Sequence, residues 1–185
     1  MGTLAQQLLM LPNVLTLLRI AMTPVVLILL NQGTPRSCFV AACLYILSAV
    51  TDAVDGWIAR RWQLQSLLGR FLDPLADKIL VAAILIYLVD LGWVPAWATI
   101  LILVRELSVT SLRALASSEG LVLGAQRGGK EKTALQMVAI LLLLVHYEYT
   151  LDFVFFSVRA DLSVAGLAVL YIGLVWAYGS SITSL

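Results

Sequence analysis

Aspartates occupy the centre of the sequence at spacings that suit helices: Asp52, Asp55, Asp73 and Asp77. The first two are three residues apart and the last two are four apart, so each pair shares one face of a helix. Pro74 either makes the preceding aspartate the amino-terminal cap of its helix or kinks the helix there. The short loop of residues 61 to 68 makes the two helices antiparallel neighbours. We therefore expect the four carboxylates to converge on one polar pocket.

Carboxylate oxygens are ligands for hard divalent cations, and two such ions would balance four negative charges. Magnesium or manganese suits an all-oxygen site, whereas zinc does not, because no His or Cys lies on this stripe. Gly56, Ala59 and Gly69 leave room for a diphosphate group to approach closely, and Arg60 is placed to meet its charge. A purely structural interpretation, with acidic caps and small packing residues, explains any one of these residues but not the whole spacing.

The composition indicates the elements that must carry this pocket. The chain has 185 residues, of which 61% are hydrophobic and 12% charged, unlike an ordinary soluble domain. We expect an all-α integral membrane protein with a single domain over residues 1–185 and a short interfacial helix over residues 1–11. Six transmembrane helices are predicted over residues 12–31, 38–60, 69–91, 94–116, 130–148 and 162–182, with breaks at Gly33–Pro35, Gly92–Pro95 and Gly120–Gly129.

The lengths of these spans place charges inside the membrane. From Ile79 to Val89 the third span offers only about 16 Å of uncharged helix, roughly half of the hydrocarbon thickness. It must therefore include its two aspartates and Lys78, and the second span must include its own pair for the same reason. The fourth span likewise includes Arg105 and Glu106. Each unpaired charge at this depth costs roughly 2.5 to 3.5 kcal/mol or more, so the carboxylates need compensating charge.

The distribution of basic residues predicts the orientation, because Lys and Arg near helix ends stay on the cytoplasmic side. With the amino terminus inside, only Arg36 and Arg159 fall outside. The other basic residues fall on the inner half: Arg19, Arg60, Arg61, Arg70, Lys78, Arg105, Arg113, Arg127, Lys130 and Lys132. We expect a multi-pass protein of the inner (cytoplasmic) membrane, with both termini and the charged pocket on the cytoplasmic side.

The central segment matches the pattern D-x2-D-G-x2-A-R-x8-G-x3-D-x3-D at every fixed position and resembles the CDP-alcohol phosphotransferase family. The resemblance implies a six-helix membrane fold, usually a homodimer, and displacement of CMP from a CDP-linked substrate. It implies that all four aspartates lie at the metals and that Asp77 is the base that deprotonates the acceptor hydroxyl. The positions implied for CDP binding are Asp52, Gly56, Ala59, Arg60 and Gly69.

Other segments indicate the acceptor. Residues 12–19, P-N-x-L-T-x-x-R, resemble the first-helix signature of the family. Residues 105–106, 112–113 and 129–133 resemble the bacterial phosphatidylglycerophosphate synthases. An anionic acceptor, glycerol 3-phosphate, would explain the cations on the later helices, which are placed to clamp a phosphate: Arg105, Arg113, Lys130 and Lys132. Two alternatives stay open, namely that Lys130 belongs to the positive inner loops and that Glu106 is a structural partner of Arg105.

The sequence thus predicts transfer of the phosphatidyl group of CDP-diacylglycerol to glycerol 3-phosphate, within membrane lipid and with release of CMP. Other acceptors that this family uses remain alternatives: an inositol phosphate, phosphatidylglycerol, or serine, which the cations disfavour. An ion-coupled transporter is disfavoured because transporters place their sites near the midplane between repeats, and no repeat is visible. We expect no nucleic-acid partner.

Overall fold

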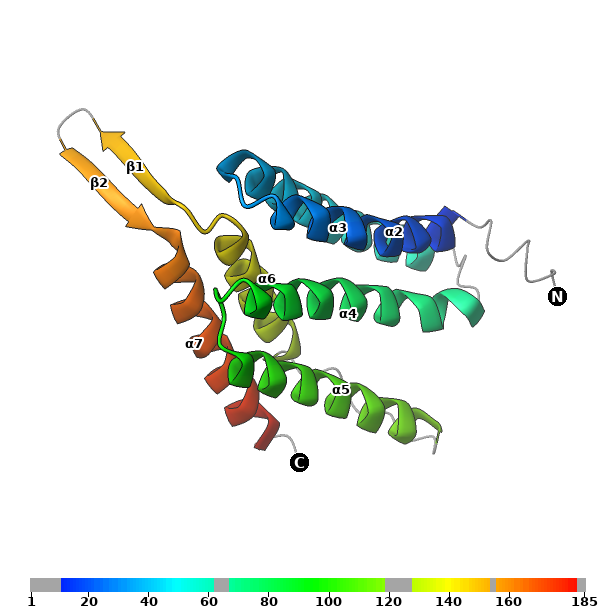
Figure 1. Cartoon of the computed structure of the whole chain (residues 1–185). Helices are drawn as coiled ribbons and strands as arrows, with labels where there is room; N and C mark the ends of the chain where they lie inside the picture. The colour runs from blue at the N-terminus through cyan, green and yellow to red at the C-terminus, as the bar shows by residue number, and fades with distance from the viewer. Residues whose placement is uncertain (1–10, 62–66, 119–127, 154–155, 183–185) are drawn as a thin grey trace. The chain divides into compact units, whose positions relative to one another are not determined.

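The computed structural model of the chain describes residues 11–61, 67–118, 128–153 and 156–182 (Figure 1). These residues form six helices and a hairpin: α2 (Leu11–Asn31), α3 (Pro35–Arg61), α4 (Leu67–Asp90), α5 (Ala96–Ser118), α6 (Gly128–Leu144), β1 (Glu148–Phe153), β2 (Phe156–Asp161) and α7 (Leu162–Ile182). The helices follow the six predicted segments closely, and the largest difference is at the end of α6. The predicted interfacial helix lies outside the described residues, except for its last position, where α2 begins.

The segment between α6 and α7 contains an element that was not predicted. β1 and β2 pair antiparallel, in a register that runs from Glu148 opposite Asp161 to Phe153 opposite Phe156. Apolar and polar residues alternate along both strands, which is the period of a β-strand. The fifth span was extended over the start of this pattern, to residue 148. The helical architecture is therefore confirmed, with a hairpin added.

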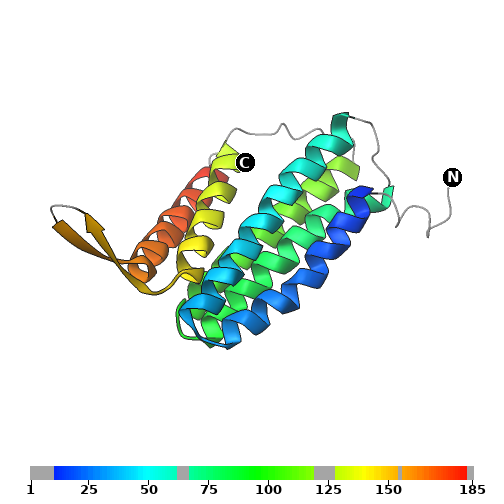
Figure 2. The same cartoon turned by 90° about the horizontal axis from the view of Figure 1, so that it is seen from above.

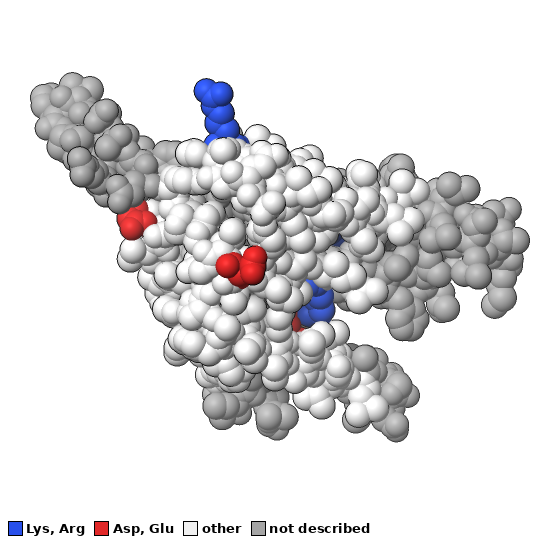
Figure 3. Space-filling view, viewed as in Figure 1, with Lys and Arg blue, Asp and Glu red and all other residues white. Residues whose placement is uncertain are grey.

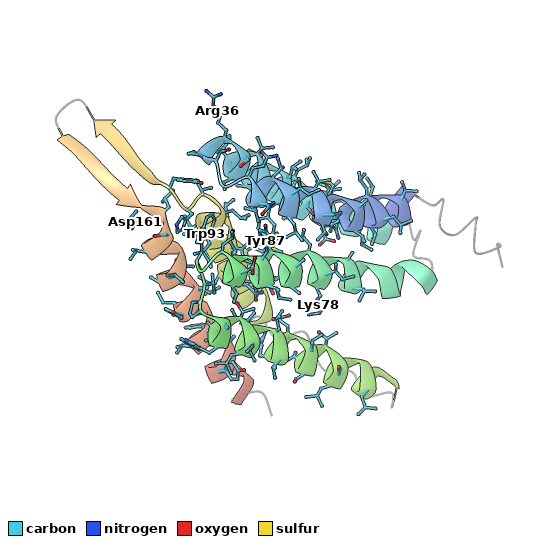
Figure 4. The ribbon with its side chains drawn as sticks, in the orientation of Figure 1. Arg36, Lys78, Tyr87, Trp93 and Asp161 are labelled. Atoms are coloured by element: carbon cyan, nitrogen blue, oxygen red, sulfur yellow. The ribbon has the colours of Figure 1, made fainter. Side chains whose placement is uncertain are left out.

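Asp161 joins the hairpin to α7 and caps the helix (Figure 4). Its Oδ1 accepts a hydrogen bond from the backbone N–H of Ser163 at 2.9 Å and another from the Ser163 hydroxyl. The hydroxyl bond, supported by the backbone bonds, lowers the pKa of this exposed carboxyl. An ionised carboxylate at this position also interacts favourably with the positive end of the helix dipole. The start of α7 is therefore set by Asp161 and its bonds to Ser163.

The chain divides into two compact units, residues 1–87 and 88–185, and each is described by itself. In the first unit α2 packs along α3, where Cys38, Ala41 and Ala42 are buried. Small residues of this kind allow two helices to approach closely. The portion of α4 that belongs to this unit, residues 67–87, runs alongside them (Figure 2). Its last residue, Tyr87, donates a hydrogen bond to Oδ1 of Asn31 at 2.7 Å.

The turn between α2 and α3 is built from residues that stop one helix and start the next. Gly33 adopts a φ of 60°, and its N–H donates to the carbonyl of Leu30 at 3.0 Å, which closes α2. Thr34 and Ser37 each donate a backbone N–H to the other's hydroxyl oxygen, at 3.2 and 3.1 Å. Pro35 occupies the first position of α3, where its missing N–H costs nothing. The predicted break at residues 33–35 is confirmed.

Aromatic contacts join the helices of the second unit. The rings of Trp93, after α4, and His146, after α6, stack with their centroids 4.0 Å apart. Trp97 of α5 stacks on Tyr171 of α7 at 5.5 Å, and Tyr178 donates to a backbone carbonyl of α5 at 3.0 Å. α7 therefore contacts α5 through aromatic side chains and packs along α6 on another face.

Apolar side chains cover much of the described surface. Residues 14–31 and 162–179 form helices that are long and apolar enough to cross a membrane, with mean hydropathies of 2.1 and 1.8. Large apolar side chains are exposed on several helices, among them Ile28 at 62% and Val175 at 72%. Figure 3 shows charged side chains only at isolated points of a largely uncharged face. Extended apolar surface of this kind suits contact with lipid.

Gly166 provides a test of the α6–α7 packing. A Cβ at this position would lie 2.8 Å from Cγ of Leu143 and 3.1 Å from its backbone nitrogen, so Gly166→Ala forces the helices apart. We expect a loss of about 1 to 3 kcal/mol, seen as a lower midpoint of thermal unfolding in detergent. Gly179→Ala is the matched control, because no atom lies within 4 Å of the added group. Equal midpoints for the two variants would contradict this packing.

Candidate active site

α3 and α4 are consecutive antiparallel helices that carry the four predicted aspartates. α3 ends and α4 begins at the same side of the first unit (Figure 1). Asp55 stands six residues before the end of α3 and Asp73 six residues after the start of α4, so each lies about 9 Å from the connected ends. Asp52 and Asp77 stand nine and ten residues from the same ends, about 14 and 15 Å away. The two pairs thus lie at matching distances along their helices from the connected ends.

The helix bounds settle one open question about Pro74. α4 begins at Leu67, so Asp73 lies in the second turn of the helix and is not its amino-terminal cap. The backbone assigns the other predicted positions to helices, while their side chains lie outside the described part of the structure. These positions are Asp55, Gly56, Ala59 and Arg60 on α3, Gly69, Asp73 and Asp77 on α4, Arg113 on α5, and Lys130 and Lys132 on α6.

Asp52 has a cationic partner on α2. Nη1 of Arg19 lies 2.6 Å from Oδ1 of Asp52, a short charge-assisted hydrogen bond. The Arg19 side chain is only 4% exposed, whereas that of Asp52 is 43% exposed. The guanidinium is therefore buried between helices, and the carboxylate keeps an accessible side.

Sequence reasoning used Arg19 only as part of a first-helix signature and missed this contact. The available signal was a single arginine within an otherwise apolar span, because such a charge is normally paired. Nearby polar side chains on α2 are also buried, namely those of Thr16 and Thr23. The Thr23 hydroxyl donates back to the carbonyl of Arg19 at 3.3 Å, which satisfies that hydroxyl within the helix.

Arg105 lies in a cleft of the second unit, between α5, α6 and α7. The cleft is small, with about 20 Å³ of space, and is lined by Ile102, Arg105, Glu106, Gln136, Leu170, Gly173, Leu174 and Ala177. The Arg105 side chain is 13% exposed, and its Nη1 donates to Oε1 of Glu106. Among the described residues its buried Nε has no hydrogen-bond partner. Arg105 thus has a neighbouring counter-ion and retains one donor.

The contact with Glu106 supports one of the alternatives left open by the sequence, in which Glu106 is a partner of Arg105. Gln136, on α6, is a lining residue that sequence reasoning missed. Its signal was a lone amide in the apolar run 134–145. The cleft therefore brings one guanidinium, one carboxylate and one amide together within apolar walls.

The predicted residues fall into two groups by unit. The aspartates and the predicted CDP-binding positions belong to the first unit, and the predicted acceptor-binding cations belong to the second. Within the first unit the structure brings Arg19 to Asp52 and sets the aspartate pairs at matching distances from the connected ends of α3 and α4. Within the second it brings Arg105 to Glu106 and Gln136.

A family model described as CDP-alcohol phosphatidyltransferase matches residues 9–178. The chain belongs to this family. The match spans both aspartate pairs and nearly all of the described helices, so the family resemblance found in the central motif is confirmed. Members of this family are membrane-embedded enzymes that use a divalent metal. This CDP-alcohol phosphatidyltransferase is therefore an enzyme of membranes, as its composition predicted.

Several curated phosphatidyltransferases are similar to this chain. The CDP-diacylglycerol–glycerol-3-phosphate 3-phosphatidyltransferase of Bacillus subtilis is 41% identical over 148 residues, which cover 74% of this chain and 77% of the relative. A probable phosphatidylglycerophosphate synthase of Mycobacterium tuberculosis is 44% identical over 133 residues, 70% of this chain and 63% of the relative. A cardiolipin synthase (CMP-forming) of Oryza sativa is 33% identical over 180 residues, 90% of this chain and 53% of the relative.

Proposed function

We propose that the protein transfers the phosphatidyl group of CDP-diacylglycerol to glycerol 3-phosphate, releasing CMP and forming phosphatidylglycerophosphate. The observation that carries this proposal is the complete aspartate pattern, set at matching distances from the connected ends of α3 and α4 in a chain of this family. The activities for which the bacterial relatives are named favour glycerol 3-phosphate as the acceptor.

The proposed metal site consists of Asp52, Asp55, Asp73 and Asp77 and holds two divalent cations, magnesium or manganese. Asp52 is the one of these four whose side chain is described, and it fits this role because it offers oxygen donors and an accessible side. When bound, the ions neutralise charge on the diphosphate and on the leaving CMP. Asp77 takes the proton from the acceptor hydroxyl, whose oxygen attacks the phosphorus that bears diacylglycerol. The bond from this phosphorus to the CMP oxygen then breaks.

The order of residues along the helices supports an orientation for the donor, CDP-diacylglycerol. Gly56, Ala59 and Arg60 lie between the first aspartates and the end of α3, and Gly69 lies between the start of α4 and Asp73. CDP recognition, to which Asp52 also contributes, is therefore directed toward the connected ends of the helices. With those ends cytoplasmic, the nucleotide faces water and the acyl chains face hydrocarbon, as the solubility of each part requires.

The acceptor phosphate is assigned to Arg105, Arg113, Lys130 and Lys132. Arg105 supports this assignment, because its guanidinium is largely buried, lines the cleft beside Glu106 and Gln136, and retains a donor that no described residue takes. Glu106 leaves the pair without net charge, so an anion would meet Arg105 through directed hydrogen bonds more than through long-range attraction. The rice relative favours a second candidate acceptor, phosphatidylglycerol, which is also anionic.

We place all six helices across the cytoplasmic membrane, with both termini and the active site on the inner side. The support is the uneven distribution of basic residues, of which only Arg36 and Arg159 fall outside. The proposal includes a homodimer, as in the family resemblance, and the exposed apolar side chains of the helices provide surface for either lipid or a second copy.

The acceptor is tested with purified protein, CDP-diacylglycerol, magnesium and each candidate acceptor, by measuring CMP and identifying the lipid product. We expect phosphatidylglycerophosphate from glycerol 3-phosphate and reversible loss of activity on chelation. Asp52→Asn removes a metal ligand and should lower turnover severely, whereas Asp77→Asn should lower kcat with metal binding largely retained. If CMP is released only with an acceptor other than glycerol 3-phosphate, the proposed acceptor is wrong. Full activity in excess chelator would reject the metal site.

Arg105 separates acceptor binding from donor binding. Arg105→Ala should raise the KM for glycerol 3-phosphate with little change in that for CDP-diacylglycerol. A charge-assisted hydrogen bond contributes about 1.5 to 3 kcal/mol, which predicts a loss of about ten- to a hundredfold in acceptor efficiency. Arg105→Lys should restore only part of it, because an ammonium cannot reproduce the bidentate fork. Equal effects on both substrates would make Arg105 structural.

The orientation is tested by cysteine labelling. The background lacks Cys38 and Cys43, which are the free cysteines of the sequence. A single cysteine placed between residues 62 and 66 should react with a membrane-impermeant thiol reagent only after the inner face is opened. A cysteine in place of Arg36, which is exposed and points away from α3 (Figure 4), should react in intact cells. The opposite pattern would reverse the orientation and move the active site outside.

A further inference from the structure

The pair of Arg19 and Asp52 has a consequence for metal binding. Arg19 is almost fully buried on an apolar helix, and its Nη1 contacts the Oδ1 of a predicted metal ligand at 2.6 Å. Loss of the contact would take this counter-ion from a buried guanidinium, which is destabilising. The contact therefore positions Asp52 and offsets its charge.

A divalent cation that takes Asp52 as a ligand must share its carboxylate with this guanidinium. The two positive charges then repel one another, and the repulsion is strong where the effective dielectric constant is low. The attraction between Arg19 and Asp52 also weakens once the metal draws on the same negative charge. Arg19 thus stabilises the metal-free protein more than the metal-bound protein.

We propose that Arg19 is a positioning residue that tunes metal affinity: it holds Asp52 in place without metal and weakens binding of the ion that Asp52 ligates. This inference rests on the proposed metal site. The opposite effect would follow if orientation dominated, because a partner that only orients a ligand raises metal affinity. The charge on Arg19 and the accessible side of Asp52 favour repulsion as the larger effect.

The test uses the full-length protein, stripped with chelator and titrated with Mn²⁺, with free Mn²⁺ followed by electron paramagnetic resonance. Arg19→Gln should lower the unfolding temperature of the metal-free protein and tighten Mn²⁺ binding by roughly 5- to 50-fold, the usual size of coupling between sites. Arg19→Lys, which keeps the charge, should stay near the parent affinity. Arg36→Gln is the matched control, because it removes the same charge from an exposed position of α3 and should change neither quantity.

A double-mutant cycle connects the effect to the contact. In an Asp52→Asn background, Arg19→Gln should alter Mn²⁺ affinity much less than in the parent, since the shared carboxylate is gone and only repulsion over a longer distance remains. Equal or weaker Mn²⁺ binding by Arg19→Gln alone would overturn the proposal, while Mn²⁺ binding by the parent protein would leave the metal site standing. If Arg19→Gln folds only when Mn²⁺ is present, the proposal is supported; failure to fold with and without Mn²⁺ makes Arg19 structural. A parent protein that binds no Mn²⁺ rejects the metal site and this inference together.

Discussion

Charge compensation within apolar helices is the constraint on which the arrangement of this protein depends. An unpaired charge in hydrocarbon costs roughly 2.5 to 3.5 kcal/mol or more, yet the chain carries charged residues on several helices. Two cations whose side chains are described are paired with carboxylates: the buried Arg19 with Asp52, and the partly buried Arg105 with Glu106. The first pair joins two helices and the second joins neighbours on one helix. The same requirement therefore produces a contact between α2 and α3 in one unit and a polar cleft in the other.

The depth of the aspartates depends on where helices end. Both pairs are counted from the connected ends of α3 and α4, so inserting one residue within the first turns of α4 would displace Asp73 and Asp77 from that end by about 1.5 Å and rotate them by about 100°. The far ends are closed by glycines with positive φ, Gly33 before α3 and Gly92 after α4. Two backbone hydrogen bonds complete the cap of α4. The Gly92 N–H donates to the carbonyl of Val89, and the Trp93 N–H donates to that of Leu88. Turn chemistry distant from the site thus fixes where α3 begins and α4 ends.

Local signals explain which features could be read from the sequence. Apolar length and breaker residues predicted the helices, and spacing predicted that each aspartate pair shares a helix, because both properties depend on residues close in the chain. The contact of Arg19 with Asp52 spans 33 positions and depends on how α2 packs against α3, which no local pattern encodes. The hairpin had a local signal, but its apolar residues beside the end of α6 resembled the continuation of a span. Gln136 was missed because a lone amide in an apolar helix acquires meaning only from the cleft around it.

The donor and the acceptor differ in how far local chemistry specifies them. Recognition of a diphosphate through metal requires several carboxylates at fixed spacing, and few other functions require that pattern within a membrane. Recognition of a phosphate monoester requires only cations, which also gather on the cytoplasmic side of membrane proteins for reasons of topology. Burial separates these two causes, because a cation that serves topology can remain in water. Arg105 is 13% exposed and lines a cleft with an amide and a carboxylate, so topology alone does not account for its position.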